Sequence, residues 1–377
     1  MIVKQEIIKL IEISRFYGEN KEFVIAGGGN TSFKTESTLW IKASGTSLNN
    51  ITEEGFVSLN RHYLNKISSK KYSKDVTKRE DEVKNDLAAS KTDTSSELRP
   101  SVEAMLHHII PHSFVVHTHS TIGNALLCSN DVEKVIPELF GNKVLYIPYT
   151  DPGYLLYKKT EEELEKHLEK TGYYPKIILL QNHGVFVSGE NINEIKQIYD
   201  FLISTVNNKI TRDIVTTENP LPDAFIKLIP KLIEKFQEYS FFTVRNTKLY
   251  DYFLQNSQTF QGISKPFTPD IIVYCKSKYL YIEDNWQDTD KVFSKISYFH
   301  VKNHYYPKII LIKGVGVVSL EVSQEKADSV ADVFLDMAKI GFLSKDFGGP
   351  HFMNKKQISF IENWEVEHYR KKVFDKS

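Results

Sequence analysis

A repeated segment constrains the fold of this chain more than any other feature of its sequence. The seven residues YYPKIIL at 173–179 recur without change at 305–311, 132 positions later. In the same register Gly184-Val185 falls on Gly316-Val317, and a helical pattern follows each copy. A self-match of this length predicts a duplicated structural unit. The similarity is local, and the important difference is at the turn, where Asn182-His183-Gly184 becomes Gly314-Val315-Gly316.

The first half of the chain alternates between helical and strand-like patterns, which predicts a layered α/β domain. We expect a helix over residues 1–17, strands over 23–26 and 38–42, and a helix from Pro100 to His112. Residues 66–99, dense in Lys, Ser, Asp and Glu, are expected to form an exposed, partly mobile excursion. Residues 217–223 have the composition of a linker, so we predict domains over 1–216 and 224–377.

Composition limits the classes of partner and the compartment. Lys+Arg and Asp+Glu both number 48, so no net field favours nucleic acid or an anionic membrane surface. The longest apolar runs are too short to span a bilayer, and residues 1–11 resemble an amphipathic helix without a signal-peptide core. Only two cysteines occur, which argues against a disulfide framework. We therefore expect a cytoplasmic protein with a small-molecule substrate.

Three histidines form the candidate metal site. His117 and His119 close an apolar run, and residues two apart on a strand point to the same side. A third histidine, His183, lies in a second strand-to-turn signal that ends in Asn-His-Gly. Three imidazoles with an open fourth position suit a catalytic Zn²⁺. A histidine pair of this spacing also occurs on ordinary strands, and we read His107, His108 and His112 as structural.

Other motifs offer groups for catalysis and anion binding. Gly27–Ser32 and Ser44-Gly45-Thr46 combine glycines with hydroxyls, a composition that suits either an anion site or a plain turn. No nucleotide-binding glycine fingerprint accompanies them. Ser101 stands at a predicted helix start, and Glu103 follows as either a dipole partner or a general acid/base. The turn at 146–154 is rich in tyrosine, and one of its phenols could donate a proton.

The order of these motifs, GGGN, SG, PSxE, HxH, IPYxxPG and NHG, resembles the class II (zinc-dependent) aldolase/adducin family over roughly residues 1–210. Within it, residues 27–32, 39–45 and 100–103 look like the aldolase part of bacterial rhamnulose-1-phosphate aldolase/lactaldehyde dehydrogenase fusion proteins. The C-terminal half also looks like the middle region of those fusions. The resemblance implies a three-layer α/β/α domain with a mostly antiparallel central sheet, followed by a smaller degenerate repeat without metal ligands.

The resemblance also implies a role for each matching residue. One Zn²⁺ per chain would be held by three ligands, and Glu103 would be the catalytic carboxylate. The acid tyrosine of the family comes from a neighbouring subunit, and both Tyr149 and Tyr154 are candidates for it here. The implied metal ligands are His117, His119 and His183. The implied phosphate-binding residues are Gly29, Asn30, Thr31, Ser44, Gly45 and Ser101. Val102 stands where the family commonly has a second serine.

The implied activity is retro-aldol cleavage of a ketose 1-phosphate, or a related sugar phosphate, to dihydroxyacetone phosphate and an aldehyde. A sugar-phosphate epimerase or dehydratase on the same fold is one alternative. Epimerising members of the family carry an aspartate where this chain has Glu103. A non-catalytic, adducin-like binding protein is the other alternative, although adducins lack the metal histidines. The family forms cyclic tetramers, so we expect a homo-oligomer, either a tetramer or a dimer of tandem domains.

Overall fold

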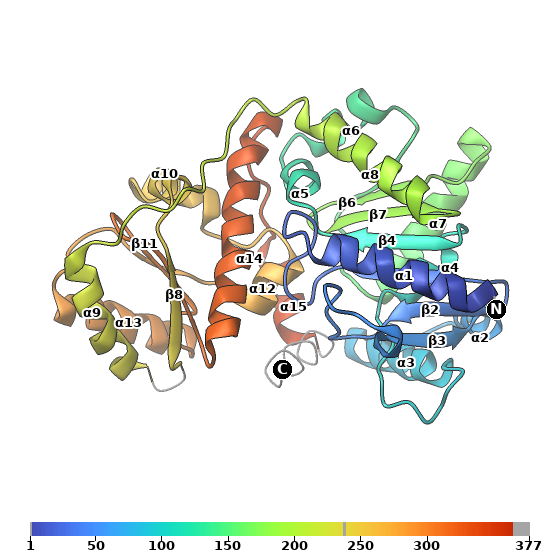
Figure 1. Cartoon of the computed structure of the whole chain (residues 1–377), viewed down its shortest axis with the longest axis horizontal. Coiled ribbons are helices and arrows are strands. Elements are labelled where there is room, and N and C mark those ends of the chain that lie inside the picture. The colour runs from blue at the N-terminus through green and yellow to red at the C-terminus, as the bar shows by residue number, and fades with distance from the viewer. Residues whose placement is uncertain (1, 237–238, 365–377) are drawn as a thin grey trace. The chain divides into compact units, whose positions relative to one another are not determined.

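The computed structural model describes residues 2–236 and 239–364, which divide into two compact units (Figure 1). The first unit holds residues 2–127, 131–209 and 363–364 of this part of the chain, and the second holds 128–130, 210–236 and 239–362. We propose that these units are the two predicted domains, with the linker beginning near residue 210. The predicted second domain also included residues 365–377, which lie outside the described part.

The first unit is built around a seven-stranded sheet in the order β3-β2-β1-β4-β7-β6-β5. All neighbouring strands are antiparallel except β5 and β6, which run parallel. The prediction of a mostly antiparallel sheet is therefore confirmed. The strands are β1 (Asn30–Lys34), β2 (Thr38–Lys42), β3 (Phe56–Asn60), β4 (Phe114–Thr118), β5 (Leu145–Ile147), β6 (Ile177–Leu180) and β7 (Gly184–Gly189).

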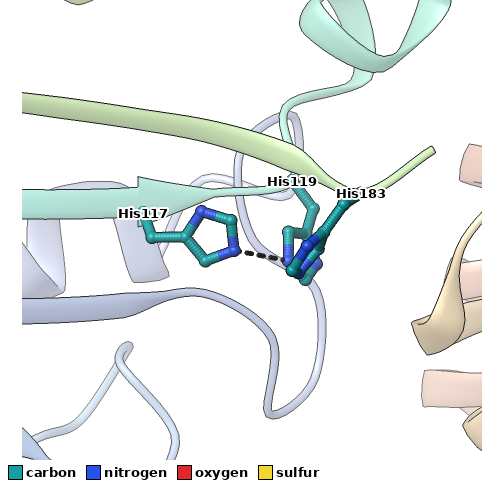
Figure 2. Close-up of side chains that lie close together, drawn as sticks. All are labelled: His117, His119 and His183. Atoms are coloured by element: carbon teal, nitrogen blue, oxygen red, sulfur yellow. Dashed lines mark hydrogen bonds between the residues drawn. The ribbon is translucent and has the colours of Figure 1, made fainter. Parts of the chain in front are cut away.

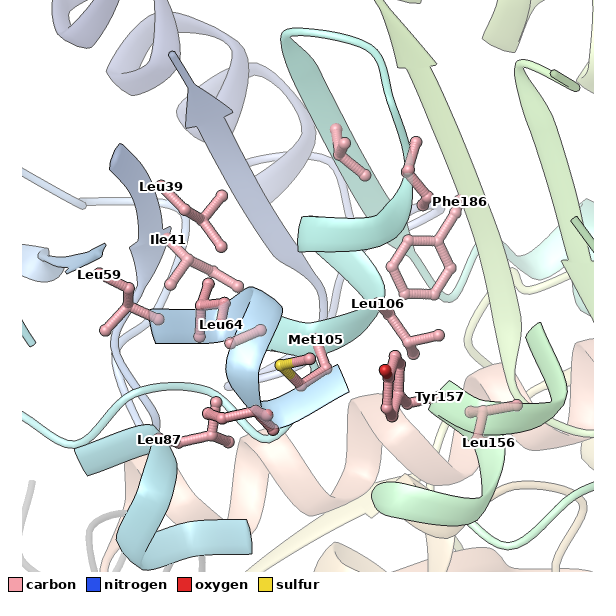
Figure 3. Close-up of a cluster of buried hydrophobic side chains, with 14 of the residues drawn as sticks. Leu39, Ile41, Leu59, Leu64, Leu87, Met105, Leu106, Leu156, Tyr157 and Phe186 are labelled. Atoms are coloured by element: carbon pink, nitrogen blue, oxygen red, sulfur yellow. The ribbon is translucent and has the colours of Figure 1, made fainter. Parts of the chain in front are cut away.

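Helices cover both faces of this sheet, which makes the predicted three layers. On one face α1, α5 and α8 pack together, and α1 buries its apolar stripe of Ile7, Leu10, Ile13 and Tyr17. On the other face α2, α3, α4 and α7 enclose a cluster that includes Leu39, Leu87 and Tyr157 (Figure 3). The helices of this unit are α1 (Ile2–Gly18), α2 (Arg61–Ser69), α3 (Val76–Ala89), α4 (Ala104–Ile109), α5 (Thr121–Leu127), α6 (Val132–Phe140), α7 (Tyr154–Thr171) and α8 (Ile192–Asn207).

Three expectations about local structure were wrong. Residues 23–26 form no strand: the glycine turn precedes β1, which begins at Asn30, and Phe23 packs its ring on Tyr17 instead. Residues 66–99 are not simply an exposed excursion, because α3 buries Val83 and Leu87, four residues apart on one face of a charged helix. The helix expected from residue 100 is shorter, since Pro100 pairs in a bridge and α4 begins only at Ala104.

The second unit contains a four-stranded sheet in the order β8-β11-β10-β9. Its strands are β8 (Phe241–Arg245), β9 (Leu280–Ile282), β10 (Ile309–Ile312) and β11 (Gly316–Glu321). Its helices are α9 (Asp223–Lys235), α10 (Lys248–Phe253), α11 (Ser257–Phe260), α12 (Pro269–Cys275), α13 (Thr289–Asn303), α14 (Gln324–Leu343) and α15 (Lys355–Asn363), the last of which ends in residues of the first unit. Within the described ranges, no helix is both long and apolar enough to cross a membrane.

The two sheets confirm the duplication at the level of strand register. β10 pairs with β11 as β6 pairs with β7: Ile309↔Ser319 repeats Ile177↔Val187, 132 positions later. β9 and β10 are parallel, as β5 and β6 are, and β8 takes the place of β4 beside β11. The second unit therefore repeats the β4-β7-β6-β5 half of the first sheet. This is the smaller degenerate repeat that the resemblance implied.

Candidate metal centre and active site

The three predicted histidines lie together in the first unit. His117 is in β4, His119 follows the end of that strand, and His183 is in the turn between β6 and β7 (Figure 2). Each offers one ring nitrogen, and these nitrogens lie within 4.8 Å of one another. β4 and β7 are neighbours in the sheet, so the pairing of two distant segments creates the cluster.

Hydrogen bonding directs the ring of His117 toward the cluster. Its Nδ1 lies 3.0 Å from the carbonyl oxygen of Val185, which can only accept, so Nδ1 carries the proton. The lone pair of Nε2 is then available on the opposite side of the ring, where Nε2 of His119 lies 3.0 Å away. A metal-binding histidine commonly donates its second ring nitrogen to a carbonyl in this way. Figure 2 shows this approach of the His117 and His119 rings as a dashed line.

Glu103 brings a carboxylate to the same place from the residue just before α4. Its Oε1 lies 3.3 Å from Nε2 of His117 and 3.5 Å from Nε2 of His183. Its Oε2 accepts a hydrogen bond from Nδ2 of Asn30 at 3.1 Å. The sequence placed Glu103 in the first turn of a helix beginning near Ser101. It instead lies just before α4, which begins only at Ala104, and its carboxylate is directed toward the histidines.

Asn30 and Ser101 stand beside that carboxylate. Asn30 is opposite His117 in the β1–β4 pairing, and its Nδ2 also donates to Oγ of Ser101 at 2.6 Å. The Oδ1 atom of Asn30 is buried and has no hydrogen-bond partner among the described residues. A buried acceptor without a partner in this part of the chain costs free energy unless a ligand satisfies it. The Asn30 Oδ1 atom is therefore an acceptor that the described residues leave unused.

The two glycine-containing turns also come together near Ser101. The backbone N–H of Ser44 donates to the carbonyl of Arg99 at 2.9 Å, which joins the Ser44-Gly45 turn to the segment of Ser101. Gly29 and Gly45 both have positive φ, at 69° and 84°, a conformation that favours glycine. At Gly29 a Cβ would lie 3.0 Å from the carbonyl oxygen of His117, so this glycine also permits close packing against the histidine strand.

The predicted contribution of Thr31 needs correction. Neighbouring residues of a strand point to opposite faces, so Thr31 faces α1 while Asn30 faces the histidines. The Thr31 hydroxyl is 2.7 Å from that of Ser14 in α1. The Thr31 side chain is therefore directed away from the histidines, and only its backbone remains a substrate-binding candidate. Val102 has its side chain in an apolar pocket with Leu87 and Tyr154, whereas the neighbouring Ser101 hydroxyl is directed to Asn30.

The two tyrosine candidates have different surroundings. Burial, and then the nearby Asp151 carboxylate, raise the pKa of Tyr149 well above its ordinary value, which keeps the phenol protonated. Tyr154 begins α7, and its ring packs edge-on against Tyr72 and Tyr157 at centroid distances of 5.1 and 6.0 Å. Tyr154 thus contributes to the helical layer over the sheet. The assignment of the acid tyrosine therefore stays a prediction.

Two residues near the site escaped the sequence interpretation. Gly184 lies so close to the histidines that a Cβ there would be 2.7 Å from Cδ2 of His119 and 3.0 Å from Cε1 of His117. Lys42 is buried, and its Nζ donates to the carbonyls of Gly27 at 3.2 Å and Thr46 at 2.7 Å, which ties the two turns together. Lys42 ends the predicted strand at 38–42 and Gly184 belongs to the Asn-His-Gly turn, but the sequence gave no sign of these contacts.

The structural histidines behave as predicted. His107 is fully buried, its Nδ1 is 2.7 Å from the Ser32 hydroxyl, and burial lowers its pKa to about 3. His112 bonds Ser188 at 2.8 Å through Nδ1. Such groups remain neutral and support the sheet beneath the site.

The donor set fits a metal ion. Two imidazole nitrogens that face each other at 3.0 Å, with a third nitrogen and a carboxylate oxygen nearby, suit a shared cation. The glycine at position 184 leaves room for this approach, as a Cβ would not. Three imidazoles with a carboxylate are typical of Zn²⁺ sites, and other divalent transition metals accept the same ligands. The three histidines could therefore hold a metal ion.

Comparison with known proteins identifies the family. The chain matches the family model described as the class II aldolase and adducin N-terminal domain over residues 8–205. That match covers more than half of the 377 residues, and the chain belongs to the class II aldolase/adducin family. The resemblance deduced from the motifs is thus confirmed.

Individual relatives are distant. A methylthioribulose-1-phosphate dehydratase of Pseudoalteromonas translucida is 24% identical over 217 residues, which cover 52% of this chain and 88% of that protein. An L-fuculose phosphate aldolase of Methanocaldococcus jannaschii is 25% identical over 181 residues, which cover 46% of this chain and 78% of that protein. The Bacillus subtilis protein named uncharacterized oxidoreductase YuxG is 26% identical over 191 residues. That match covers 48% of this chain but only 26% of YuxG, so the chain spans about a quarter of that relative's length.

Proposed function

We propose that this chain is a zinc-dependent aldolase that cleaves a ketose 1-phosphate, or a related sugar phosphate, to dihydroxyacetone phosphate and an aldehyde. The observation that carries the proposal is the position of Glu103 Oε1, 3.3 Å from His117 and 3.5 Å from His183. A carboxylate at this distance from three clustered imidazoles is suited to proton transfer beside a metal-bound substrate. One Zn²⁺ per chain would be held by His117, His119 and His183, and would act as a Lewis acid toward the ketose carbonyl.

The residues of the chain would perform the remaining tasks. Breaking a carbon–carbon bond next to a carbonyl leaves negative charge on carbon, and Glu103 would hold the proton that this carbon takes up. The hydrogen bond from Asn30 keeps the Glu103 carboxylate turned toward the site. The backbone N–H groups of the Gly29 and Gly45 turns and the Ser44 and Ser101 hydroxyls would bind the phosphate. In cleavage the hydroxyl that becomes the aldehyde loses its proton, which Tyr149 would accept, and in the reverse direction the Tyr149 phenol would return that proton to the aldehyde oxygen.

A dehydratase is the second candidate function. The methylthioribulose-1-phosphate dehydratase aligns with 52% of this chain, about as much as the fuculose phosphate aldolase, and their identities differ by only one percentage point. The same carboxylate could remove a proton next to the carbonyl, after which water rather than an aldehyde would leave. An epimerase is less favoured, because Glu103 stands where the resemblance gives epimerases an aspartate. A binding protein without activity is disfavoured by the complete donor set.

Product analysis tests the proposal. Purified protein loaded with Zn²⁺ would be incubated with fuculose, rhamnulose and methylthioribulose 1-phosphates, and the products analysed by mass spectrometry. Dihydroxyacetone phosphate together with an aldehyde supports the aldolase. One product lighter by a water molecule identifies the dehydratase, and an isomeric sugar phosphate identifies the epimerase. No turnover of any sugar phosphate by the metal-loaded protein would overturn the proposal. Sedimentation of the same sample tests the proposed homo-oligomer, which a monomer would exclude.

A further inference from the structure

Gln181 connects two segments of the site that lie more than thirty residues apart in the sequence. It follows β6 and stands two positions before His183. Its backbone N–H donates to the carbonyl of Ile147 at 3.1 Å. Its side-chain Oε1 accepts the backbone N–H of Tyr149 at 2.9 Å. One residue of the metal-ligand turn thus holds both the end of β5 and the segment that carries the candidate acid tyrosine.

The Gln181 side chain makes this contact at the point where the β5–β6 ladder ends. β5 and β6 pair in parallel up to Ile147↔Leu180, and the next residue after β5 is Pro148. Alternate residues of a parallel strand bond to the same neighbour, so after the bond from Gln181 N–H to the Ile147 carbonyl the next donor in the ladder is the Tyr149 N–H. The Gln181 amide oxygen takes the place of a strand carbonyl and accepts the following N–H, that of Tyr149. The backbone of Tyr149 is therefore fixed by a residue of the neighbouring strand-to-turn segment.

The far end of the tyrosine segment is held separately. The backbone N–H of Tyr154 lies 3.4 Å from Oε2 of Glu80, a residue of α3. Gly153 has φ 91° and is packed closely, since a Cβ there would lie 2.5 Å from that same carboxylate oxygen. Residues 148–153 are thus anchored at both ends. The Gln181 anchor differs from the Glu80 anchor because it also belongs to the turn of His183.

The duplicated unit provides an internal comparison. Lys313 is the counterpart of Gln181, and its backbone N–H makes the equivalent bond to the carbonyl of Ile282 at 3.0 Å. The turn therefore forms without a glutamine side chain. Glu283, and not a proline, follows β9. The second unit, which has Val315 in place of His183, has neither the proline nor the glutamine at these positions. The turn therefore does not need the Gln181 side chain in order to form.

We propose that Gln181 is a positioning residue that fixes Tyr149 relative to the metal-ligand turn. Its side chain acts through the backbone of Tyr149 and makes no direct contribution to the chemistry. This inference rests on the proposed function, since Tyr149 matters to turnover only as a proton-transfer group. Gln181 would position residues 148–153 in the same way whether Tyr149 completes the site of its own chain or that of a neighbouring subunit.

The first experiment measures the loop directly and needs no activity. Hydrogen–deuterium exchange of residues 148–153 would be compared in the full-length wild type, Gln181→Met and Gln181→Glu, each with its zinc content. Methionine keeps the size and loses the acceptor, whereas glutamate keeps an acceptor. We expect exchange at the Tyr149 amide to be roughly tenfold or more faster in Gln181→Met and near wild type in Gln181→Glu, with zinc retained in both. Lys313→Met is the matched control and should leave this exchange unchanged.

The second experiment tests the link to Tyr149 with a double-mutant cycle. Gln181→Met should lower kcat roughly 10–100-fold with little change in KM, because misplacing a catalytic group by about 1 Å costs a factor of this size. Gln181→Glu should restore most of the rate. If Gln181 acts through Tyr149, adding Gln181→Met to Tyr149→Phe should slow the enzyme no further. Additive losses in the double variant would overturn the inference.

The outcomes separate this inference from the proposed function. Unchanged exchange at Tyr149 in Gln181→Met, or equal loss of zinc and activity in that variant, overturns the inference and leaves the aldolase proposal standing. Faster exchange with zinc retained supports the inference even if the wild type cleaves no sugar phosphate, a result that would overturn only the proposed function.

Discussion

The Nδ1 atom of His117 and the carbonyl oxygen of Val185 lie 3.0 Å apart, and this contact leaves Nε2 as the ring nitrogen available to a metal. Val185 is the pairing partner of Thr118 in the β4–β7 ladder. The backbone of the neighbouring strand therefore selects the tautomer of His117. The sheet thus contributes a hydrogen-bond acceptor to the site as well as a scaffold for the side chains.

The metal site predicts a paired loss of metal and stability. The wild type is expected to bind about one Zn²⁺ per chain, and His117→Ala/His119→Ala to bind none, because only one imidazole would remain. Since a ligand that binds only the folded state stabilises it, chelation should lower the Tm of the wild type but not of the variant. Plasma mass spectrometry measures the zinc content and calorimetry measures the Tm, with His300→Ala as the control. Equal zinc content in all three proteins would contradict the assignment.

Gly184 predicts a substitution that harms the site through crowding alone. A Cβ at this position would lie 2.5 Å from the carbonyl oxygen of Thr118 and would press on both neighbouring imidazoles. Gly184→Ala should destabilise the fold by about 1–3 kcal/mol and also reduce zinc affinity. Its counterpart Gly316 is more tightly crowded, since a Cβ there would lie 2.2 Å from the carbonyl oxygen of Arg245, so Gly316→Ala should reduce stability but not zinc affinity. Zinc titration with urea unfolding distinguishes the two effects, and unaltered affinity in Gly184→Ala would refute the argument.

Glu103 predicts a separation of catalysis from metal binding. Glu103→Gln preserves size and an acceptor but cannot exchange a proton at this position. We expect kcat to fall by roughly 10²–10⁴-fold while zinc content stays at the wild-type level. Steady-state kinetics on the substrate found by product analysis, with parallel metal assays, provide the test. A variant that retains more than about a tenth of the rate would show that Glu103 is not the proton-transfer group.

The opposite directions of Asn30 and Thr31 predict opposite outcomes for neighbouring substitutions. Asn30→Ala removes the hydrogen bond to Glu103 and the acceptor that has no described partner, so kcat should fall and KM should rise. Thr31→Val removes only a hydroxyl that faces Ser14, so both kinetic constants should be near wild type. Calorimetric binding of inorganic phosphate gives an independent measure. Weaker phosphate binding in Thr31→Val would restore the Thr31 side chain to the site.

His108 predicts part of the pH dependence of stability. It is buried, accepts from Arg61 through Nδ1 and contacts Asn65 through Nε2, and burial followed by Arg61 lowers its pKa to about 3. Below pH 6.5 the unfolded chain takes up a proton here that the folded chain does not. Stability is therefore fully present above pH 6.5 and lost as the pH falls toward 3, by about 1.4 kcal/mol per pH unit.

Urea unfolding at pH 7 and pH 5 measures this contribution. In His108→Gln the loss of stability between these two pH values should be smaller than in the wild type by about 2 kcal/mol. The wild type unfolded under the same conditions is the reference. If His108→Gln shows the full wild-type loss, His108 is already protonated in the folded state.

Much of the architecture could be read from sequence because its signals are local. The apolar run before His117 predicted β4, the spacing of apolar residues predicted α1, and the seven-residue self-match at an offset of 132 predicted a duplicated unit. The expected strand at 23–26 was wrong because a short apolar run does not reveal whether a neighbouring strand is available. The apolar residues of α3 were missed because two buried positions do not stand out among so many charges.

The sequence by itself determined which chemical groups the site contains: three imidazoles, one carboxylate and glycine-rich turns, in the order of one family. Only the tertiary structure decided how they meet. Strand pairing placed Val185 behind His117, turned Thr31 away and set Gln181 against Tyr149, because each contact joins residues far apart in the chain. Side-chain identity is encoded locally, but hydrogen-bond direction and close approach depend on the register of strands that the sequence brings together only on folding.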